Sequence, residues 1–403
     1  MSSGREDYDV VVVGGGVMGL FTAYHASALG ARVAVVECGR VGDPARASFG
    51  RTRSYRSDYL DATYARLAHE AFRLWCDFEE QTATEVLVRC GCMNIAKRSV
   101  TPDLAGTYAQ MSHDTLTRLG MRTEALDDVA LRRRFTFLDA DIARIDLDGG
   151  VVDVPAVTRA LTDTLRERGV AVLEGVAPSA LVRDGARFRV LRGAEELGAG
   201  SLVVTAGHGT NQLLSLLPGR TLRVPIAKDR PSEAKYLTPP AAVRDLFVAG
   251  AMPTIAYLDT GIYCHPIVEG LVEAVKIGYY NPPDLPRSAT VIDSIATFVE
   301  QCLPGLEGAT VRDVEDVDQC DYDLVADDEF VLGPVPDVAG AFVGVGWRGT
   351  GYKFAPWVGL VLAELALEGG TAYDIARFDP ARFQKGGVID EPSIAQDAAA
   401  ASS

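Results

Sequence analysis

The sequence predicts an α/β protein in which a parallel sheet at the N-terminus is joined to a second α+β domain built on a mostly antiparallel sheet. Residues 10–13 form a β-branched run that is typical of a strand buried on both faces, and 342–345 form a second such run near the C-terminus. From about residue 222, segments such as 261–265 and 273–280 alternate apolar and polar residues, which favours antiparallel strands. A chain of 403 residues is also too long for one ordinary core, so two domains are expected.

The first strand leads into a glycine-rich turn. Gly14, Gly16 and Gly19 have the spacing G-x-G-x-x-G, which allows a tight turn, close approach of the backbone to a pyrophosphate and close packing of helix on strand. A helix expected over 17–29 points its N-terminal N–H groups at that phosphate. The next strand ends in Glu37, whose carboxylate can accept hydrogen bonds from a ribose diol. This order predicts dinucleotide binding; the alternative is an ordinary βαβ unit with a glycine-rich turn.

Composition and charge limit the kind of partner and the compartment. Hydrophobic residues make up 48% of the chain and charged residues 23%, as in globular proteins. A net charge of −16 argues against nucleic acid or an anionic membrane as partner. No apolar signal segment precedes the first strand, and glycines interrupt the apolar stretch that follows, so we expect neither export nor a membrane span. Seven scattered cysteines suit a reducing cytoplasm and suggest no metal site.

Four stretches resemble the FAD-dependent amine oxidases of the D-amino-acid oxidase superfamily, in particular monomeric sarcosine oxidases and glycine oxidases. They are the glycine turn with Glu37, the G-x-T-R-x-x-R-x-x-Y string 50–59, the C-x-Y string 320–322 followed by an E-F pair, and the G-x-x-G-x-G-x-K-F string 346–354. These stretches span nearly the whole chain in the order that the family has. The resemblance therefore concerns the architecture as well as single motifs.

The resemblance implies an interrupted Rossmann-like FAD-binding domain with a second α+β substrate domain laid over the flavin. The FAD-binding domain would comprise residues 1–85, 149–218 and 318–390, and the substrate domain 86–148 and 219–317. The tail, 391–403, is expected to be disordered.

The implied reaction is oxidation of the C–N bond of a secondary amine or amino acid, with hydride transfer to flavin, imine hydrolysis and reduction of O₂ to H₂O₂. The implied cofactor is therefore FAD, the partners are a small amine or amino acid and O₂, and the assembly is a monomer or small homo-oligomer. A role in specialised metabolite biosynthesis fits relatives of this kind.

Two cations match the residues with which the family holds a substrate carboxylate. The guanidinium of Arg56 can bind a carboxylate through two parallel hydrogen bonds, and the ammonium of Lys353 adds a positive charge. Arg56 could instead be a solvated surface arginine beside acidic neighbours such as Asp58. Lys353 lies in a glycine-rich loop before an apolar helix, an unusual place for a charge without a function.

Two further cations are assigned to the flavin. A helical turn would place Arg53 on the same face as Arg56, and the resemblance puts Arg53 next to the flavin ring. Lys276 faces away from its apolar strand neighbours and matches the lysine that the family places near flavin N5, through water, for oxygen activation. The alternative for Lys276 is a strand lysine facing solvent. Tyr322 would line the substrate cavity.

Cys320 matches the cysteine that monomeric sarcosine oxidase joins to the flavin 8α-methyl group. Glycine oxidases hold FAD without a covalent bond, and an isolated cysteine is often a small buried apolar residue. The resemblance assigns contacts with the cofactor to Gly14, Gly16, Val17, Met18, Gly19, Glu37, Ser48, Thr52, Arg53, Val176, Gly207, Cys320, Gly349, Gly351 and Lys353.

The substrate site departs from the sarcosine oxidase pattern. Phe49, Tyr280 and Thr350 occupy positions where that family has histidines, and His265 lies close to its tyrosine position. The loss of these polar histidines and the gain of Phe49 and Trp347 favour a substrate that is larger and more apolar than sarcosine, such as an N-substituted glycine or a cyclic amino acid. No general base is evident, and none is needed if the amine binds in its neutral form.

Three other functions remain open from the sequence. The first is an FAD-dependent amino-acid dehydrogenase that uses an acceptor other than O₂. The second is an NAD-linked dehydrogenase, against which the interrupted layout and the C-terminal glycine string argue. The third is a non-catalytic flavin-binding protein, which would have had no reason to keep all four cations.

Overall fold

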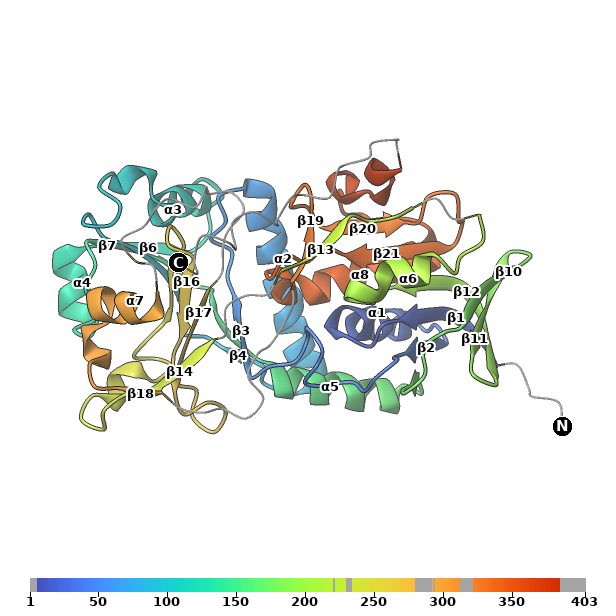
Figure 1. Cartoon of the computed structure of the whole chain (residues 1–403), viewed down its shortest axis with the longest axis horizontal. Coiled ribbons are helices and arrows are strands. Elements are labelled where there is room, and N and C mark those ends of the chain that lie inside the picture. The colour runs from blue at the N-terminus through green and yellow to red at the C-terminus, as the bar shows by residue number, and fades with distance from the viewer. Residues whose placement is uncertain are drawn as a thin grey trace, which may run out of the picture.

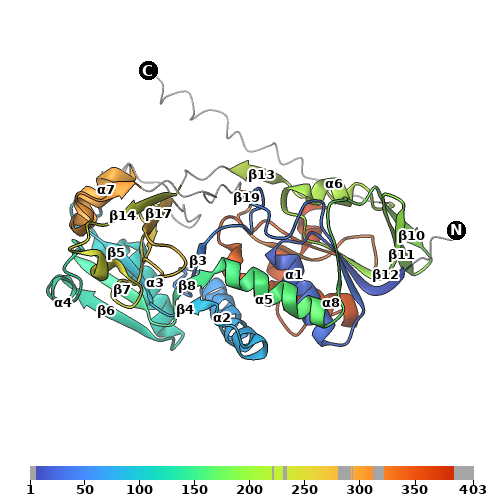
Figure 2. The same cartoon turned by 90° about the horizontal axis from the view of Figure 1, so that it is seen from below.

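The computed structural model describes residues 6–219, 222–229, 234–279, 292, 294–311 and 322–384. Two large sheets lie at opposite ends of an elongated molecule (Figure 1). In both views, strands β3 and β4 and helix α2 (Ala62–Thr82) lie between the two sheets (Figure 2). Across the described residues, no helix is both long and apolar enough to cross a membrane.

The first large sheet contains the predicted N-terminal unit. Its central strands are parallel, with Val10 opposite Val33 on one side and Ser201 on the other. The strand order is β10-β11-β12-β1-β2-β9, and β21 and β20 extend the sheet from β12. The strands are β1 (Glu6–Val13), β2 (Val33–Val36), β9 (Ala171–Leu173), β10 (Ala180–Asp184), β11 (Arg187–Arg192), β12 (Glu195–Val204), β20 (Val331–Pro334) and β21 (Ala341–Val345).

Helices pack closely on this sheet. Helix α1 (Val17–Ala28) crosses α8 (Ala355–Glu368) so tightly that a Cβ at Gly359 would lie 2.5 Å from the carbonyl carbon of Phe21. Helix α5 (Val154–Glu167) begins at its N-cap Asp153, whose carboxylate accepts from the Ala156 N–H, and runs along one side of the sheet (Figure 2). Helix α6 (Thr210–Leu214) follows β12.

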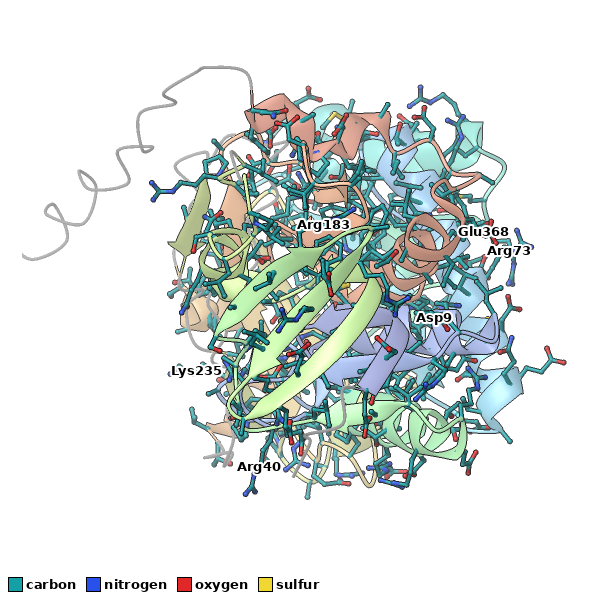
Figure 3. All side chains as sticks on the ribbon, turned by 90° about the vertical axis from the view of Figure 1, so that its right-hand side faces the viewer. Asp9, Arg40, Arg73, Arg183, Lys235 and Glu368 are labelled. Carbon is teal, nitrogen blue, oxygen red and sulfur yellow. The ribbon has the colours of Figure 1, made fainter. Side chains whose placement is uncertain are left out.

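The exposed edge of this sheet is an antiparallel ribbon of β10, β11 and β12, seen from the front in Figure 3. Its arginines are balanced by acids: the Arg189 Nε lies 2.7 Å from Glu196, and Arg192 pairs with Glu195. Arg183 covers the Phe188 ring at 4.6 Å. These contacts pair the arginines of the ribbon with neighbouring acids and with an aromatic ring.

The second large sheet has the order β18-β14-β17-β16-β15-β5-β7-β6. All its pairings are antiparallel except that of β15 with β5. The strands are β5 (Cys92–Ala96), β6 (Thr123–Asp127), β7 (Ile142–Asp146), β14 (Lys235–Thr238), β15 (Thr254–Tyr257), β16 (Ile262–His265), β17 (Val275–Tyr279) and β18 (Thr310–Val311). Its helices are α3 (Tyr108–Arg118), α4 (Asp128–Arg134) and α7 (Ile295–Cys302).

A small sheet, β3 (Thr52–Tyr55), β8 (Gly150–Asp153) and β4 (Leu87–Val88), lies between the large ones. A two-stranded ladder joins β13 (Ile226–Asp229) to β19 (Tyr322–Val325). Short 3₁₀ turns are η1 (Leu104–Gly106), η2 (Gly207–Gly209), η3 (Arg244–Phe247), η4 (Pro304–Leu306), η5 (Gly351–Phe354), η6 (Ala376–Phe378) and η7 (Pro380–Phe383).

The α/β fold class with one mostly parallel and one mostly antiparallel sheet is confirmed. The strands of the first large sheet all fall within the ranges predicted for the FAD-binding domain, and those of the second within the ranges of the substrate domain. The ladder of β13 with β19 joins the two sets of ranges, and the domain division itself stays a prediction. The predicted tail, 391–403, lies outside the described residues.

Candidate active site

A cavity of about 520 Å³ runs from the glycine turn to the second large sheet. Gly14 and Glu37 line it at one end, and His265 and Lys276 at the other. Arg56 and Lys353 also face it. Residues far apart in the chain thus surround a single chamber.

The glycines of the β1–α1 turn are required by space. A Cβ at Gly14 would lie 2.5 Å from the Thr205 carbonyl oxygen, and one at Gly19 would lie 1.9 Å from the Gly14 oxygen. Gly14 also has a φ of +118°. Gly14, Gly15 and Gly16 therefore line the cavity with bare backbone, which is the surface that a pyrophosphate approaches, whereas Gly19 packs α1 closely against the end of β1.

Two polar side chains border this turn. Ser48 Oγ accepts from the Val17 N–H at 2.9 Å, at the start of α1. Glu37, at the end of β2, accepts from the N–H groups of Gly15 and Gly39, each at 2.8 Å. Its carboxylate is thereby fixed at the cavity wall, where further lone pairs can accept from a ribose diol. The turn and the acid fit the dinucleotide part of FAD.

Arg53 folds back onto its own loop. Its guanidinium donates to the carbonyl oxygens of Thr52, at 3.1 Å, and Phe49, and it lies 5.9 Å from the centre of the Tyr352 ring. Residues 52–55 form strand β3, so the expected helical turn that would align Arg53 with Arg56 is wrong. Both arginines nevertheless line the cavity.

Arg56 is buried, at 7% exposure, so its interpretation as a solvated surface residue is wrong. Its Nη1 lies 2.5 Å from the Asp58 carboxylate, and Asn94 donates to the other oxygen of that carboxylate. The guanidinium also lies over the Tyr59 ring, 4.7 Å from its centre. Arg56 is thus held in one orientation by a buried acid.

Lys353 lies beside this pair, in turn η5. Its ammonium donates to the Thr350 carbonyl oxygen at 2.9 Å and to the Thr350 hydroxyl at 2.7 Å. The Tyr59 hydroxyl shares that Thr350 oxygen at 2.5 Å. Burial lowers the pKa of Lys353 well below its usual range, Arg56 lowers it further, and Asp58 raises it. An arriving carboxylate would favour the protonated form.

The far wall of the cavity is formed by β16 and β17. His265 and Lys276 are register partners. His265 joins the Thr52 hydroxyl at 2.8 Å through Nδ1 and the Ser54 hydroxyl at 2.7 Å through Nε2. Lys276 is 1% exposed and donates to the Thr52 carbonyl oxygen at 3.3 Å, so its solvent-facing interpretation is wrong.

The loop 346–351 is held by a buried acid that sequence reasoning missed. Asp323 accepts from the N–H groups of Gly346 at 2.9 Å and Trp347 at 3.0 Å. Burial raises the pKa of Asp323 to about 6, although these two donors oppose the shift. The Tyr322 ring packs on Gly349, where a Cβ would lie 2.5 Å from the ring. Asp323 could have been found from the sequence, because it directly follows Tyr322, which was predicted to line the substrate cavity.

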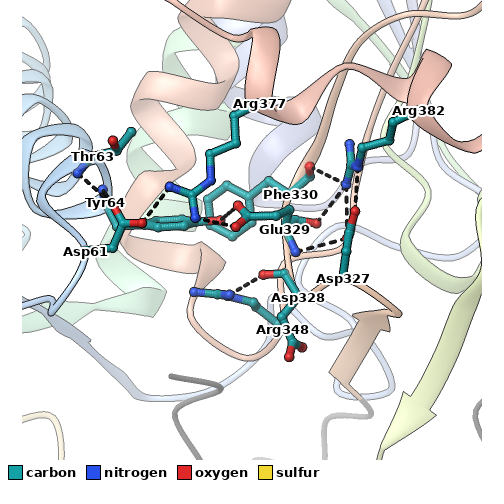
Figure 4. A network of polar contacts seen from close by, with 10 residues as sticks. All are labelled: Asp61, Thr63, Tyr64, Asp327, Asp328, Glu329, Phe330, Arg348, Arg377 and Arg382. Atoms are coloured by element: carbon teal, nitrogen blue, oxygen red, sulfur yellow. Dashed lines mark hydrogen bonds and ion pairs between the residues drawn. The ribbon is translucent and has the colours of Figure 1, made fainter. Parts of the chain in front are cut away.

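A second polar network supports this loop from outside (Figure 4). Arg348 donates to the Asp328 carbonyl oxygen and covers the Tyr64 ring at 4.7 Å. The Tyr64 hydroxyl donates to Glu329 at 2.9 Å, and Arg377 pairs with Glu329 as well. The C-terminal turns are thereby tied to α2 and to the cavity loop.

The remaining predicted residues are placed as follows. Most of them line the cavity, namely Gly16, Val17, Met18, Ser48, Phe49, Thr52, Gly207, Trp347, Gly349, Thr350 and Gly351. Val176 is 42% exposed and does not line it, although the neighbouring Ala177 does. Tyr280 and Cys320 lie outside the described residues.

A dinucleotide turn that shares one chamber with buried cations fits the class of dinucleotide-dependent enzymes. Residues 9–365 match the model of the DAO family, described as FAD dependent oxidoreductase, and the chain belongs to that family. The resemblance identified from the sequence is therefore confirmed.

The relatives are similar along their whole length. Human peroxisomal sarcosine oxidase is 28% identical, with 95% of this chain and 98% of that protein covered. N-methyl-L-tryptophan oxidase of Yersinia pestis is 27% identical, with 94% and 100% covered. Among solved structures, the open form of NikD, described as an unusual amino acid oxidase essential for nikkomycin biosynthesis, has a TM-score of 0.73 at 26% identity, with 93% and 98% covered.

Proposed function

We propose that this FAD-dependent oxidoreductase oxidises the C–N bond of a secondary amine or amino acid that carries a carboxylate. The observation that supports this proposal most directly is that Arg56 and Lys353, both buried, face the same cavity as the dinucleotide turn. Arg56 is already paired with Asp58, whereas the hydrogen-bond acceptors described for Lys353 are the two uncharged oxygens of Thr350. A further anion would stabilise this second buried cation, which favours an acidic ligand. The named relatives act on sarcosine and N-methyl-L-tryptophan, which agrees with such a substrate.

Arg56 and Lys353 orient the substrate. Arg56 is preset by Asp58 and by the Tyr59 ring, so little side-chain entropy is lost when a carboxylate binds. Lys353 can turn its protons from Thr350 toward the same anion. Fixing the carboxylate at this end directs the amine toward the part of the cavity lined by Tyr322 and Lys276.

When bound, FAD supplies the acceptor for the hydride equivalent removed from the carbon that bears the amine, and the imine product then hydrolyses in water. Arg53, on β3, donates to the Phe49 carbonyl oxygen in the segment whose Ser48 borders the glycine turn, and there its charge favours negative charge on the cofactor. Lys276 is buried in the wall, where its charge lowers the cost of negative charge that develops when O₂ is reduced to H₂O₂. The amine reacts as the free base, so no protein base is required.

We also propose that FAD is covalently attached through Cys320. The string Cys320–Tyr322 supports this proposal, because Tyr322 lines the cavity. Acid precipitation tests it: the yellow pigment stays in the pellet if the bond exists and remains in the supernatant if it does not. A Cys320→Ser variant should release its pigment.

The substrate is larger and more apolar than sarcosine. Phe49, Trp347 and Tyr263 supply aromatic surface to the cavity, and Leu258 adds aliphatic surface. Peroxide assays over N-substituted glycines and cyclic amino acids test this proposal. Sarcosine as the best substrate would contradict it.

The function itself is tested by mixing substrate with the purified protein without air and then adding O₂. Bleaching of the flavin followed by fast recovery and peroxide formation supports an oxidase. Bleaching with slow recovery would indicate a dehydrogenase with another acceptor. No bleaching by any amine would contradict the proposal.

A further inference from the structure

The buried acid Asp58 has no role in the chemistry described above. Its carboxylate lies 2.5 Å from Arg56 Nη1, and the side chains of both residues are at most 5% exposed. The Asn94 amide, on β5, donates to its second oxygen. Asp58 therefore reduces the charge that Arg56 presents to the cavity.

The surroundings of this pair contain several other ionisable groups. Lys353 and Arg348 affect the same site electrostatically, and Asp146 and Cys92 lie on the side of the second sheet. Burial and, to a smaller extent, the charge of Asp58 raise the pKa of Asp146 to about 7. Among the described residues, Asp58 pairs directly with Arg56, at a distance where charge compensation is strongest.

The balance of charge at the carboxylate-binding end follows from these contacts. Arg56 and Lys353 contribute two positive charges when Lys353 is protonated, and Asp58 removes one. A single carboxylate then neutralises this group of three described side chains. A second carboxylate would add an unbalanced negative charge next to Asp58 in a poorly solvated site.

We propose that Asp58 determines specificity by leaving the pocket with charge for one carboxylate, so that monocarboxylic amino acids are accepted and dicarboxylic ones rejected. This inference rests on the proposed function, because it assumes that the substrate carboxylate binds at Arg56 and Lys353. Asp58 acts through Arg56 and is not itself a group that reacts.

Ligand titration of the FAD-loaded enzyme tests this inference without turnover. Acetate and malonate are titrated at fixed ionic strength in slightly acidic buffer, and binding is followed by the change in flavin absorbance. The wild-type protein should bind acetate in preference to malonate. Asp58→Asn should shift the ratio of the two affinities toward malonate by about tenfold, since one buried charge is no longer compensated.

Two further variants separate charge from other effects. Asp245→Asn changes the net charge equally at a fully exposed side chain and should leave the ratio unchanged. The double variant Arg56→Gln with Asp58→Asn removes the pair while conserving the pocket charge. It should bind acetate more weakly but keep the wild-type ratio, and it avoids leaving Arg56 buried without its acid.

The outcomes are distinguishable. Malonate binding as tightly as acetate to the wild-type protein, or the same ratio in Asp58→Asn, would overturn the inference while leaving the proposed function intact. A wild-type protein that binds neither anion and is bleached by no amine would overturn the proposed function, and the inference with it.

Discussion

Replacing Gly19 by alanine tests the argument that the glycine turn must remain bare. The new Cβ would lie 1.9 Å from the Gly14 carbonyl oxygen and 2.7 Å from Thr205 Oγ1, whereas real Cβ contacts below 3.0 Å are essentially never seen. Because the first of these atoms is backbone, helix α1 must move away from β1. Overpacking of this severity costs about 3 kcal/mol.

Two consequences should be measured. The thermal midpoint should fall by roughly 5 °C, as follows from that cost in a large domain. FAD content after purification should fall as well, because the start of α1 is displaced from the cavity wall. The matched control is Gly370→Ala, where a Cβ would meet no atom within 4 Å. Equal stability and flavin content in the two variants would refute the packing argument.

Two further predictions concern buried charges. Lys276→Met should leave anaerobic flavin reduction within a few-fold of wild type but slow reoxidation by O₂ by about 100-fold. Stopped-flow absorbance measures both rates, and Lys97→Met, directly after β5, is the control. Unchanged reoxidation would argue against the role of Lys276. For Asp146, burial raises the pKa from 3.8 to about 7. The unfolded chain therefore releases this proton at lower pH than the folded protein does. The stability contribution is complete below about pH 4 and is lost as pH rises toward 7. Urea unfolding across this range should show that loss in the wild type and a smaller one in Asp146→Asn, and parallel curves would contradict it.

Features encoded by short stretches of sequence were predictable. The run from β1 to Glu37 combines strand, glycine spacing and helix within 30 residues of chain, and each part indicates the same structure. The alternation of β16 and β17 likewise predicted the second sheet. In these stretches, the local preference for helix or strand and the pattern of buried residues indicate the same structure.

Features that depend on distant partners were not predictable. The sequence left open a surface position for Arg56 beside acidic neighbours such as Asp58, because the contact of Asp58 with Asn94 spans 36 residues. Likewise, His265 meets Thr52 and Ser54 across more than 200 residues. The spacing of Arg53 and Arg56 suggested a helical turn, but pairing with β8 makes this segment a strand. In each of these examples, contacts between residues far apart in the chain determine the local structure or the burial of the side chain.

The most direct test of the central claim compares anaerobic flavin reduction by an N-methyl amino acid with reduction by the matching amine that lacks the carboxylate. In the wild type, the amino acid should react far faster. Arg56→Gln and Lys353→Met should each lower kred/Kd for the amino acid by about 100-fold, the loss expected when a charged hydrogen bond is removed, and leave the amine unaffected. Arg166→Gln, at an exposed side chain, serves as the control. Equal losses for both compounds, or none for either, would contradict the claim that these buried cations bind the substrate carboxylate.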